Sequence, residues 1–391
     1  MISRVCENTY VIFSALYYPN IGGVENFTRS ISKQLVRMGH RVIVVTSSAT
    51  NMSGEEDDGL ITVFRFPSIM LLNGRLPFPL LSHRYFALWR SLLDINCDGV
   101  LVNTRFYPHS ILGLHYARKK GITPVLLEHG SAYLTLGSRP LDAILHAYEN
   151  AITRIVKLYG CLFYGVSKSC CEWLNHFGIS AKGVIPNAIN VDEFRSISSG
   201  FNIRDSLSID DSTEIVLFIG RLVPEKGIDS LISAASHLCD IDVKIVVVGD
   251  GPLRSSLEAS APDNVAFVGA LTREDVSAIL SQSNIVCLPS RSEGFATVLL
   301  EASAWGVPAC VTRIGGASEI ILDNEYGWLL DSADTGVLVR TLRLALSDKD
   351  VLISQGKKAK GLVEHRYTWT GSAESLVQAF RLAAQSNPVT D

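Results

Sequence analysis

The chain has 391 residues, of which 47% are apolar and 19% are charged, and its formal net charge is −4. This balance excludes a disordered chain, and the length exceeds the ~250–300 residues at which one hydrophobic core usually divides. No apolar run approaches the ~20 residues of a membrane-spanning helix, and the eight cysteines lack CxxC or Cys/His spacing, which favours free thiols. We therefore expect a two-domain cytoplasmic protein, soluble or peripheral on the inner face of the cell membrane.

Short apolar runs alternate with helical stretches along the chain, which predicts two doubly wound parallel α/β sheets. The predicted strands of the first half are Tyr10–Ser14, Arg41–Thr46, Ile61–Phe66, Gly99–Asn103, Pro124–Leu127 and Leu162–Val166. Those of the second half are Glu214–Ile219, Val243–Val248, Val265–Val268, Ile285–Leu288 and Ala309–Thr312. The polar, Ser-rich stretch after residue 193 divides the chain into domains 1–193 and 194–369. Ligands bind beyond the carboxyl ends of such strands, so we expect the active site in a cleft between the domains.

Two features of the first domain follow predicted strands. Gly22 and Gly23 come after the first strand, where glycine permits positive φ and close backbone approach to a phosphate. His129 ends a later strand and precedes Gly130, which places an imidazole at the same edge of the sheet. Taken alone, a glycine pair is merely a turn, and a lone histidine is more often structural than catalytic.

A cationic pair follows the first strand of the second domain. Arg221 and Lys226 can project over the carboxyl end of that strand toward a diphosphate, the arginine as a planar fork and the lysine as a point charge. The alternative is a solvated loop in which Glu225 is the salt-bridge partner. Asp-x-Asp spacing occurs only at positions 240/242 and 348/350, away from the expected cleft, so metal dependence is not expected.

Two glutamates, Glu293 and Glu301, flank a turn and the start of a helix expected over Phe295–Trp305 and closed by Gly306. At ~1.5 Å per residue the carboxylates would lie roughly 12 Å apart along the axis, with Glu301 about two turns inside the helix. First-turn amides can donate to a diphosphate, while one carboxylate binds hydroxyls of a sugar and the other those of a ribose. The alternative is a surface helix with two solvated acids.

Eight segments occur in an order and spacing that resemble one known family. They are Asn20–Phe27, Leu126–Gly130, Ser167–Phe194, Gly220–Gly227, Val246–Glu258, Val265–Val276, the E-x7-E stretch Pro289–Gly316, and Gly315–Ile321. Together they resemble the retaining glycosyltransferases of family 4, which have the GT-B architecture. The resemblance implies two Rossmann-like domains that face a cleft, and a last helix, about 370–391, that packs back on the first domain.

The resemblance also implies the site residues. The catalytic set is His129, Glu293, Arg221 and Lys226. The donor-binding set is Gly22, Gly23, Arg221, Lys226, Gly249, Gly251, Ala270, Leu271, Glu293, Gly294, Phe295, Ala296, Thr297, Val298 and Glu301. Asn187 is a weaker acceptor-side candidate, because relatives often have PNG where this chain has Ala188. No cofactor or metal is expected besides the nucleotide-sugar donor, since the two cations replace the metal.

The implied reaction retains the anomeric configuration. The two glutamates are too far apart for a double-displacement glycosidase, whose carboxyl groups lie ~5 Å apart, so a front-face transfer fits better. One alternative is a same-fold epimerase or hydrolase, for which only Glu128 is available as an acid or base. The other is a catalytically silent partner subunit, which would have lost Arg221, Lys226 or the glutamate pair.

Charge is divided unevenly along the chain. Residues 1–190 have 18 Lys and Arg against 12 Asp and Glu, a net charge of +6, which leaves −10 for the remainder. Residues 61–93 contain no acid, but combine arginines and aromatic residues at Arg65, Arg75, Phe78, Arg84, Phe86, Trp89 and Arg90. Such a segment suits an anionic membrane surface or, equally, ordinary packing on the domain. A lipid-linked acceptor in envelope glycan assembly is preferred over a soluble one, and nucleic acid is not an expected partner.

Overall fold

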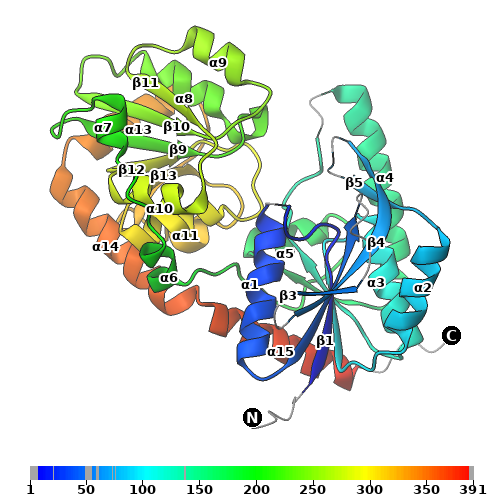
Figure 1. Ribbon diagram of the computed structural model, residues 1–391. Coiled ribbons are helices and arrows are strands. Elements are labelled where there is room, and N and C mark those ends of the chain that lie inside the picture. Colours follow the sequence, from blue (N-terminus) through cyan, green and yellow to red (C-terminus); the bar gives the residue numbers. More distant parts are fainter. Residues whose placement is uncertain are drawn as a thin grey trace. The chain divides into compact units, whose positions relative to one another are not determined.

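The computed structural model of the chain (Figure 1) describes residues 8–20, 22–48, 55–58, 61–72, 74, 76–135 and 138–386. The chain divides into two compact units: unit 1 is Met1–Asn187 with Trp369–Asp391, and unit 2 is Ala188–Thr368. The sequence places the first boundary after residue 193, whereas the structure places it after Asn187. The reason is helix α6 (Val191–Ser196), because the Phe194 carbonyl accepts a hydrogen bond from Ser277 of unit 2.

Unit 1 is built on a mostly parallel sheet. Its strands are β1 (Thr9–Phe13), β2 (Arg41–Ser48), β3 (Glu55–Asp58), β4 (Ile61–Leu71), β5 (Leu76–Pro79), β6 (Gly99–Asn103), β7 (Val125–Glu128) and β8 (Leu162–Gly165). The order is β3-β4-β2-β1-β6-β7-β8, with β3 and β5 antiparallel to β4. The chain reverses its direction across the sheet between β1 and β6, which is the topological switch point where ligands bind in open α/β sheets.

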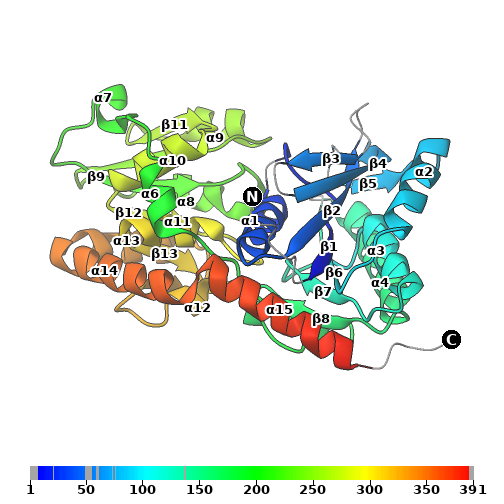
Figure 2. The same ribbon diagram turned by 60° about the horizontal axis from the view of Figure 1, so that its bottom comes forward.

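Helices cover both faces of this sheet (Figures 1 and 2). They are α1 (Gly23–Arg37), α2 (His83–Leu93), α3 (Pro108–Lys119), α4 (Arg139–Lys157), α5 (Lys168–Asn175) and α15 (Trp369–Gln385). Strand side chains alternate between the faces. Phe13 packs in a core with Leu88 of α2 and Leu114 of α3, while Tyr10 stacks at 4.5 Å on Phe380 of α15. The C-terminal helix thus packs on unit 1, against α1, β6 and β7.

Unit 2 has a fully parallel sheet of the same winding. Its strands are β9 (Glu214–Ile219), β10 (Val243–Val248), β11 (Val265–Gly269), β12 (Ile285–Leu288), β13 (Ala309–Thr312) and β14 (Gly327–Leu330). The order is β11-β10-β9-β12-β13-β14, so the switch point lies between β9 and β12. Two parallel sheets wound in the same order confirm the predicted α/β fold class.

Further helices complete unit 2. They are α6, α7 (Ile203–Leu207), the 3-10 helix η1 (Pro224–Lys226), α8 (Ile228–Ala235), α9 (Arg254–Ser260), α10 (Arg273–Ser281), α11 (Thr297–Trp305), α12 (Ala317–Ile320), α13 (Thr335–Leu346) and α14 (Lys349–Arg366). None of the helices in the described ranges is both long enough and apolar enough to cross a bilayer.

Candidate active site

The predicted donor residues of unit 2 follow the ends of four neighbouring strands. Arg221 and Lys226 come after β9, Gly249 and Gly251 after β10, Ala270 and Leu271 after β11, and Glu293 to Glu301 after β12. Because all these strands are parallel, their carboxyl ends meet at one edge of the sheet. The two cations and Glu293 flank the switch point between β9 and β12, where the fold favours a ligand.

Two glycines allow the loops at this edge to approach one another closely. Gly227 has φ +66°, and a Cβ there would lie 1.9 Å from the carbonyl oxygen of Pro289. Gly249 has φ +133°, and a Cβ there would lie 1.9 Å from the carbonyl oxygen of Gly220. Only glycine fits both positions, since any side chain would also be strained at these φ values. The loop that carries Lys226 is thereby held against the loop that carries Glu293.

Lys226 forms an ion pair with Glu293, Nζ to Oε2, and the two side chains are 24% and 18% exposed. The structure therefore contradicts the alternative in which Glu225 pairs with this lysine. The backbone carbonyl of Glu225 accepts hydrogen bonds from the backbone N–H groups of residues 291 and 292. The Arg221 side chain is exposed and makes no hydrogen bond or ion pair within the described part of the chain. Two cations and a carboxylate are thus present at the switch point of unit 2.

Helix α11 begins four residues after Glu293. The helix begins at Thr297, two residues later than predicted, and its N-cap Ala296 has no side chain that can cap it. Phe295 is buried and extends toward Gly316, where a Cβ would lie 2.4 Å from the Phe295 ring, so this residue packs outside the helix. The uncapped N-terminus leaves backbone N–H groups and the positive end of the helix dipole for an anion.

Glu301 is the fifth residue of α11, so it lies about one turn inside the helix rather than the predicted two. Burial raises the pKa of its carboxyl to about 7, and the nearby Arg273 opposes this shift. No hydrogen bond to the Glu301 carboxyl occurs among the described residues. Near neutral pH this side chain therefore exists in both protonation states.

The glycine pair of unit 1 lies at the start of α1. Gly22 is the N-cap, with φ −172°, and Gly23 is the first helical residue, so neither uses the positive φ that the sequence analysis invoked. A Cβ at position 22 would lie 2.3 Å from Oε2 of Glu25, so a larger residue there would displace the end of this flexible side chain. Burial raises the pKa of this Glu25 carboxyl. The α1 N-terminus likewise has no side-chain cap.

His129 follows β7 in unit 1 and is held from two sides. Its Nε2 lies 2.9 Å from Oδ1 of Asn103 at the end of β6. The rings of His129 and Phe27 form a T-shaped contact, with 5.1 Å between their centroids. Burial lowers the pKa of His129 to about 3, so the imidazole is neutral at physiological pH. Asn103 is not among the site residues predicted from the sequence, although its place at a strand end beside the switch point was a usable signal.

A buried ion network supports the segment after β7, and sequence reasoning missed it. Arg105 lies 2.5 Å from Oε2 of Glu128 and 2.9 Å from Oε2 of Glu149, and all three side chains are almost fully buried. The other oxygen of Glu128 accepts the backbone N–H groups of His129 and Gly130. Glu128 is therefore fully engaged in positioning the loop that carries His129.

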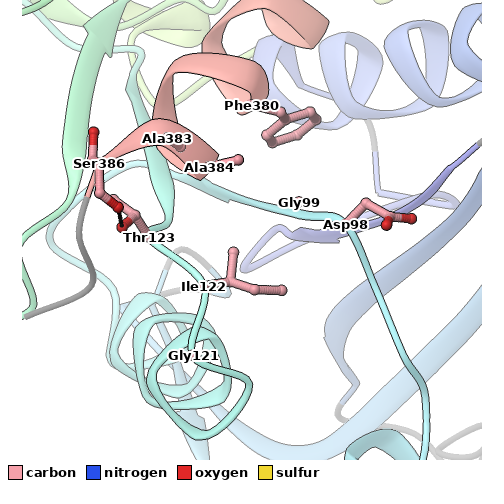
Figure 3. A pocket seen from close by; sticks show the side chains of 9 residues that line it. All are labelled: Asp98, Gly99, Gly121, Ile122, Thr123, Phe380, Ala383, Ala384 and Ser386. Carbon is pink, nitrogen blue, oxygen red and sulfur yellow. Dashed lines mark hydrogen bonds between the residues drawn. The ribbon is translucent and has the colours of Figure 1, made fainter. Parts of the chain in front are cut away.

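Asn187, the acceptor-side candidate, lies outside these clusters. Asn187 is buried at the last residue of unit 1 before the crossing to unit 2. Unit 1 also contains a cavity of about 170 Å³. Figure 3 shows the residues that line it: Asp98, Gly99, Gly121, Ile122, Thr123, Phe380, Ala383, Ala384 and Ser386. It lies at the amino ends of β6 and β7, so it contains none of the predicted site residues. In the described ranges, no three His, Cys, Asp or Glu side chains gather as a metal site.

The segment 61–93 divides into a buried and an exposed part. Arg65 is buried and donates to the Tyr18 carbonyl, so it does not belong to an exposed surface. Trp89 is partly buried against the core and stacks on the exposed His115 at 5.7 Å. Arg75 lies outside the described residues. The exposed apolar side chains of this segment, which we call the β4–β5 patch, are Ile69, Leu71, Leu72, Phe78, Leu80, Leu81 and Phe86.

This architecture occurs in solved structures. Sucrose-phosphate synthase from Thermosynechococcus elongatus matches with a TM-score of 0.78 and 19% identity, over 97% of this chain and 100% of that one. Anabaena HepE in complex with UDP and glucose matches with a TM-score of 0.73 and 17% identity, over 96% and 100%. The fold is therefore that of the GT-B glycosyltransferases.

Sequence comparison defines the family. A model described as Glycosyltransferase Family 4 matches residues 21–193, and one described as Glycosyl transferases group 1 matches residues 200–362. One subunit of the human phosphatidylinositol N-acetylglucosaminyltransferase is 27% identical over 95% of this chain and 75% of its own length. The chain belongs to glycosyltransferase family 4, and it is a glycosyltransferase.

Proposed function

We propose that the protein is a retaining glycosyltransferase that moves a sugar from a nucleoside diphosphate donor to a hydroxyl acceptor without a metal cofactor. The observation that carries the proposal is the cluster at the switch point of unit 2. There, Arg221, the Lys226–Glu293 pair and the uncapped N-terminus of α11 offer two cations, backbone donors and a carboxylate. This combination suits a diphosphate with a sugar attached to it.

The proposed roles follow from the charge that develops during transfer. As the bond between the anomeric carbon and the diphosphate breaks, Arg221, Lys226 and the α11 amides stabilise negative charge on the leaving oxygens. The leaving diphosphate accepts the proton of the acceptor hydroxyl on the same face of the sugar, which retains the configuration. Glu293 binds hydroxyls of the transferred sugar, and Glu301 binds those of the ribose.

The other predicted residues have supporting roles in this proposal. In unit 2, Gly249, Gly251, Ala270 and Leu271 contact the nucleoside through their backbone, and residues 294–298 contact the donor phosphates and sugar. From unit 1, the amides of Gly22 and Gly23 contact the donor phosphate, and His129 contacts the transferred sugar. The complex of HepE with UDP and glucose supports a UDP-hexose as the first donor to test.

For the acceptor, we propose a lipid-linked or polysaccharide intermediate of envelope glycan synthesis, with the enzyme peripheral on the inner membrane face. Two observations support it: the name of the human relative describes transfer to phosphatidylinositol, and unit 1 exposes the β4–β5 patch. Ile69 and Phe78 are cross-strand partners in this hairpin and are 52% and 49% exposed, so they form one apolar surface. A soluble acceptor is the alternative.

Two rival activities fit the contacts less well. An epimerase or hydrolase needs an acid or base that can exchange a proton, yet Glu128 is bound by Arg105 and by two backbone N–H groups. A silent partner subunit needs no diphosphate site, yet Arg221, Lys226 and both glutamates are present.

The proposal is tested by heat-stabilisation of the protein with a panel of UDP-, GDP- and ADP-sugars, because a ligand that binds the folded state raises the melting temperature. The stabilising donor is then incubated with candidate acceptors, and the anomeric configuration of the product is determined by NMR. An inverted product, or a donor that yields only an epimer or the free sugar, would overturn the proposed reaction.

We expect the two glutamates to affect different kinetic constants. Glu293→Ala should mainly lower kcat, because the sugar contact strengthens in the transition state, whereas Glu301→Ala should mainly raise KM for the donor. Loss of one hydrogen-bonded contact to a charged group corresponds to about 1.5–3 kcal/mol. Steady-state kinetics of both variants measure the division, and identical changes in kcat and KM would contradict it.

Nucleotide-sugar affinity is expected to increase as the pH rises through about 7. The pKa of the Glu301 carboxyl is about 7 without ligand, and ribose hydroxyls donate to its ionised form, so a proton competes with the ribose at lower pH. Calorimetric titrations at several pH values between 6 and 8 measure this. Glu301→Gln should bind more weakly and show no such rise; an equal rise in both proteins would contradict the role of Glu301.

The same shift predicts that Glu301 destabilises the fold at alkaline pH. The pKa of the Glu301 carboxyl is about 7 in the folded protein and 4.5 ordinarily. Between pH 4.5 and pH 7, the folded state therefore binds a proton at Glu301 that the unfolded state has lost. The stabilising contribution is therefore complete below pH 4.5 and is lost as the pH rises through 7. We expect Glu301→Gln to increase the free energy of unfolding at pH 8 by up to about 3 kcal/mol. Urea denaturation at pH 8 and at pH 5 measures the gain, which should shrink at the lower pH.

A further inference from the structure

A chain of hydrogen bonds connects helix α1 to the imidazole of His129. Thr28 Oγ1 donates to the carbonyl oxygen of Val24 at 2.7 Å, and Asn103 Nδ2 donates to Thr28 Oγ1 at 3.2 Å. Asn103 Oδ1 then lies 2.9 Å from His129 Nε2. Thr28 and Asn103 are both buried, so water does not replace these partners. The chain joins three elements of unit 1: α1, β6 and the loop after β7.

The direction of these bonds determines where the ring proton is. A hydroxyl has one proton, and Thr28 Oγ1 donates it to the Val24 carbonyl at 2.7 Å, with Ser14 Oγ as a second, longer contact at 3.2 Å. Thr28 Oγ1 therefore accepts from the Asn103 amide. The side-chain oxygen Oδ1 of Asn103 must therefore face His129, and it accepts a hydrogen bond from Nε2–H. The imidazole is neutral, which leaves Nδ1 without a proton. Nδ1 has no hydrogen-bond partner among the described residues.

The backbone beside Asn103 is strained, which is a separate sign that this position is held in place. Thr104 has φ +59°, a left-handed conformation that residues with a Cβ rarely adopt. The Thr104 N–H donates to the backbone carbonyl of Leu127 in β7, and the Thr104 hydroxyl donates to the backbone carbonyl of Asn103. Strain of this kind concentrates at functional sites, where surrounding contacts compensate for it.

We propose that Asn103 and Thr28 are positioning residues that hold His129 as the Nε2–H tautomer, so that Nδ1 accepts a hydrogen bond from a hydroxyl of the sugar. The identity of the ligand rests on the proposed function, whereas the tautomer does not. His129 then acts as an acceptor for an intact hydroxyl and not as a proton donor.

The tautomer is tested directly on the full chain without substrate. The protein is labelled with ¹⁵N-histidine, and the His129 ring signals are assigned by their loss in His129→Gln. We expect the two nitrogen shifts of the Nε2–H form in the wild type at neutral pH. In Asn103→Ala, the signals should move toward a mixture of the two tautomers. An Nδ1–H form or an equal mixture in the wild type would overturn the proposal, even if the protein is an active transferase.

Kinetics of matched variants test the consequence for the reaction. Thr28→Val keeps the shape of the side chain but removes the hydroxyl, whereas Thr28→Ser keeps the hydroxyl. We expect kcat/KM to fall about tenfold to a hundredfold in Thr28→Val, the effect of one buried polar group left unpaired, and to remain near the wild-type value in Thr28→Ser. Equal activity of the two variants would contradict the role of Thr28, once matched melting temperatures show that both are folded.

Discussion

Replacing either cation at the switch point of unit 2 is expected to cause the largest loss of activity. Arg221→Ala and Lys226→Ala should each remove about 2–4 kcal/mol of transition-state stabilisation, or about 30- to 1000-fold in kcat/KM. The reason is that charge grows on the leaving diphosphate only as the glycosidic bond breaks. For Lys226, the substitution also removes the cation that pairs with Glu293, so the sugar contact is disturbed as well.

A control variant separates this effect from a general change of surface charge. Arg343 is an exposed arginine of α13 in the same unit, and it pairs with Asp240. Asp240 lies on the loop before β10, at the edge of the sheet opposite to the strand ends of the site. Arg343→Ala should retain nearly full activity. Transfer by the wild type should also persist in EDTA, because the two cations bind the diphosphate. Loss of transfer on chelation, with recovery on adding magnesium, would show that the donor requires a metal ion.

Much of the fold could be predicted because it depends on local patterns. All eleven predicted strands are present, since a buried parallel strand is a short apolar run between turn residues. Three strands were missed for identifiable reasons. β3 consists of four acids that pair antiparallel with β4, so tertiary pairing overrides a low strand propensity. β5 and β14 are short, and their sequence neighbourhoods give little periodicity.

The places of the candidate-site residues in the fold could be predicted, but the contacts between them could not. The predicted residues of unit 2 lie in the loops after strand ends or in the helices that begin there, because the motifs follow apolar runs, and parallel topology gathers such ends at one edge. The pairing of Lys226 with Glu293 depends on the close approach at Gly227, which no local pattern encodes. The raised pKa of Glu301 and the Asn103–His129 contact also arise from packing between elements distant in sequence.

The charge of unit 1 becomes clearer once its helices are assigned to a face of the sheet. Side chains of α2, α3 and α4 contribute to one core on the same face of the sheet. α2 and α3 contain no acidic residue. α4 contains Asp142, which accepts a hydrogen bond from Thr135, and the buried Glu149, while its exposed apolar residues include Leu141, Ile144 and Ile155. This helical layer combines exposed cations with apolar side chains, a composition that supports the proposed contact with an anionic membrane.

We expect vesicle binding to depend on three arginines of the segment 61–93, the part of the sequence that also contains the β4–β5 patch. Replacing Arg75, Arg84 and Arg90 by glutamine should weaken binding to anionic vesicles by about 3 kcal/mol, more than a hundredfold, if each charge near the surface contributes about 1 kcal/mol. Arg84 and Arg90 are exposed on α2, beside the half-exposed Phe86. The binding of a soluble nucleotide-sugar donor should not change, because the donor cluster belongs to unit 2.

The measurement is cosedimentation with vesicles that contain anionic lipid, at low and at high salt, and with neutral vesicles for comparison. The matched control is a triple glutamine variant at Arg313, Arg340 and Lys357, three exposed cations of unit 2, which should bind vesicles as the wild type does. High salt should reduce wild-type binding, since surface charges are screened over about 10 Å at 0.1 M salt. Equal recovery of the wild type and both variants at low salt would contradict the proposed membrane contact and make a soluble acceptor the better hypothesis. It would not affect the proposed donor site of unit 2.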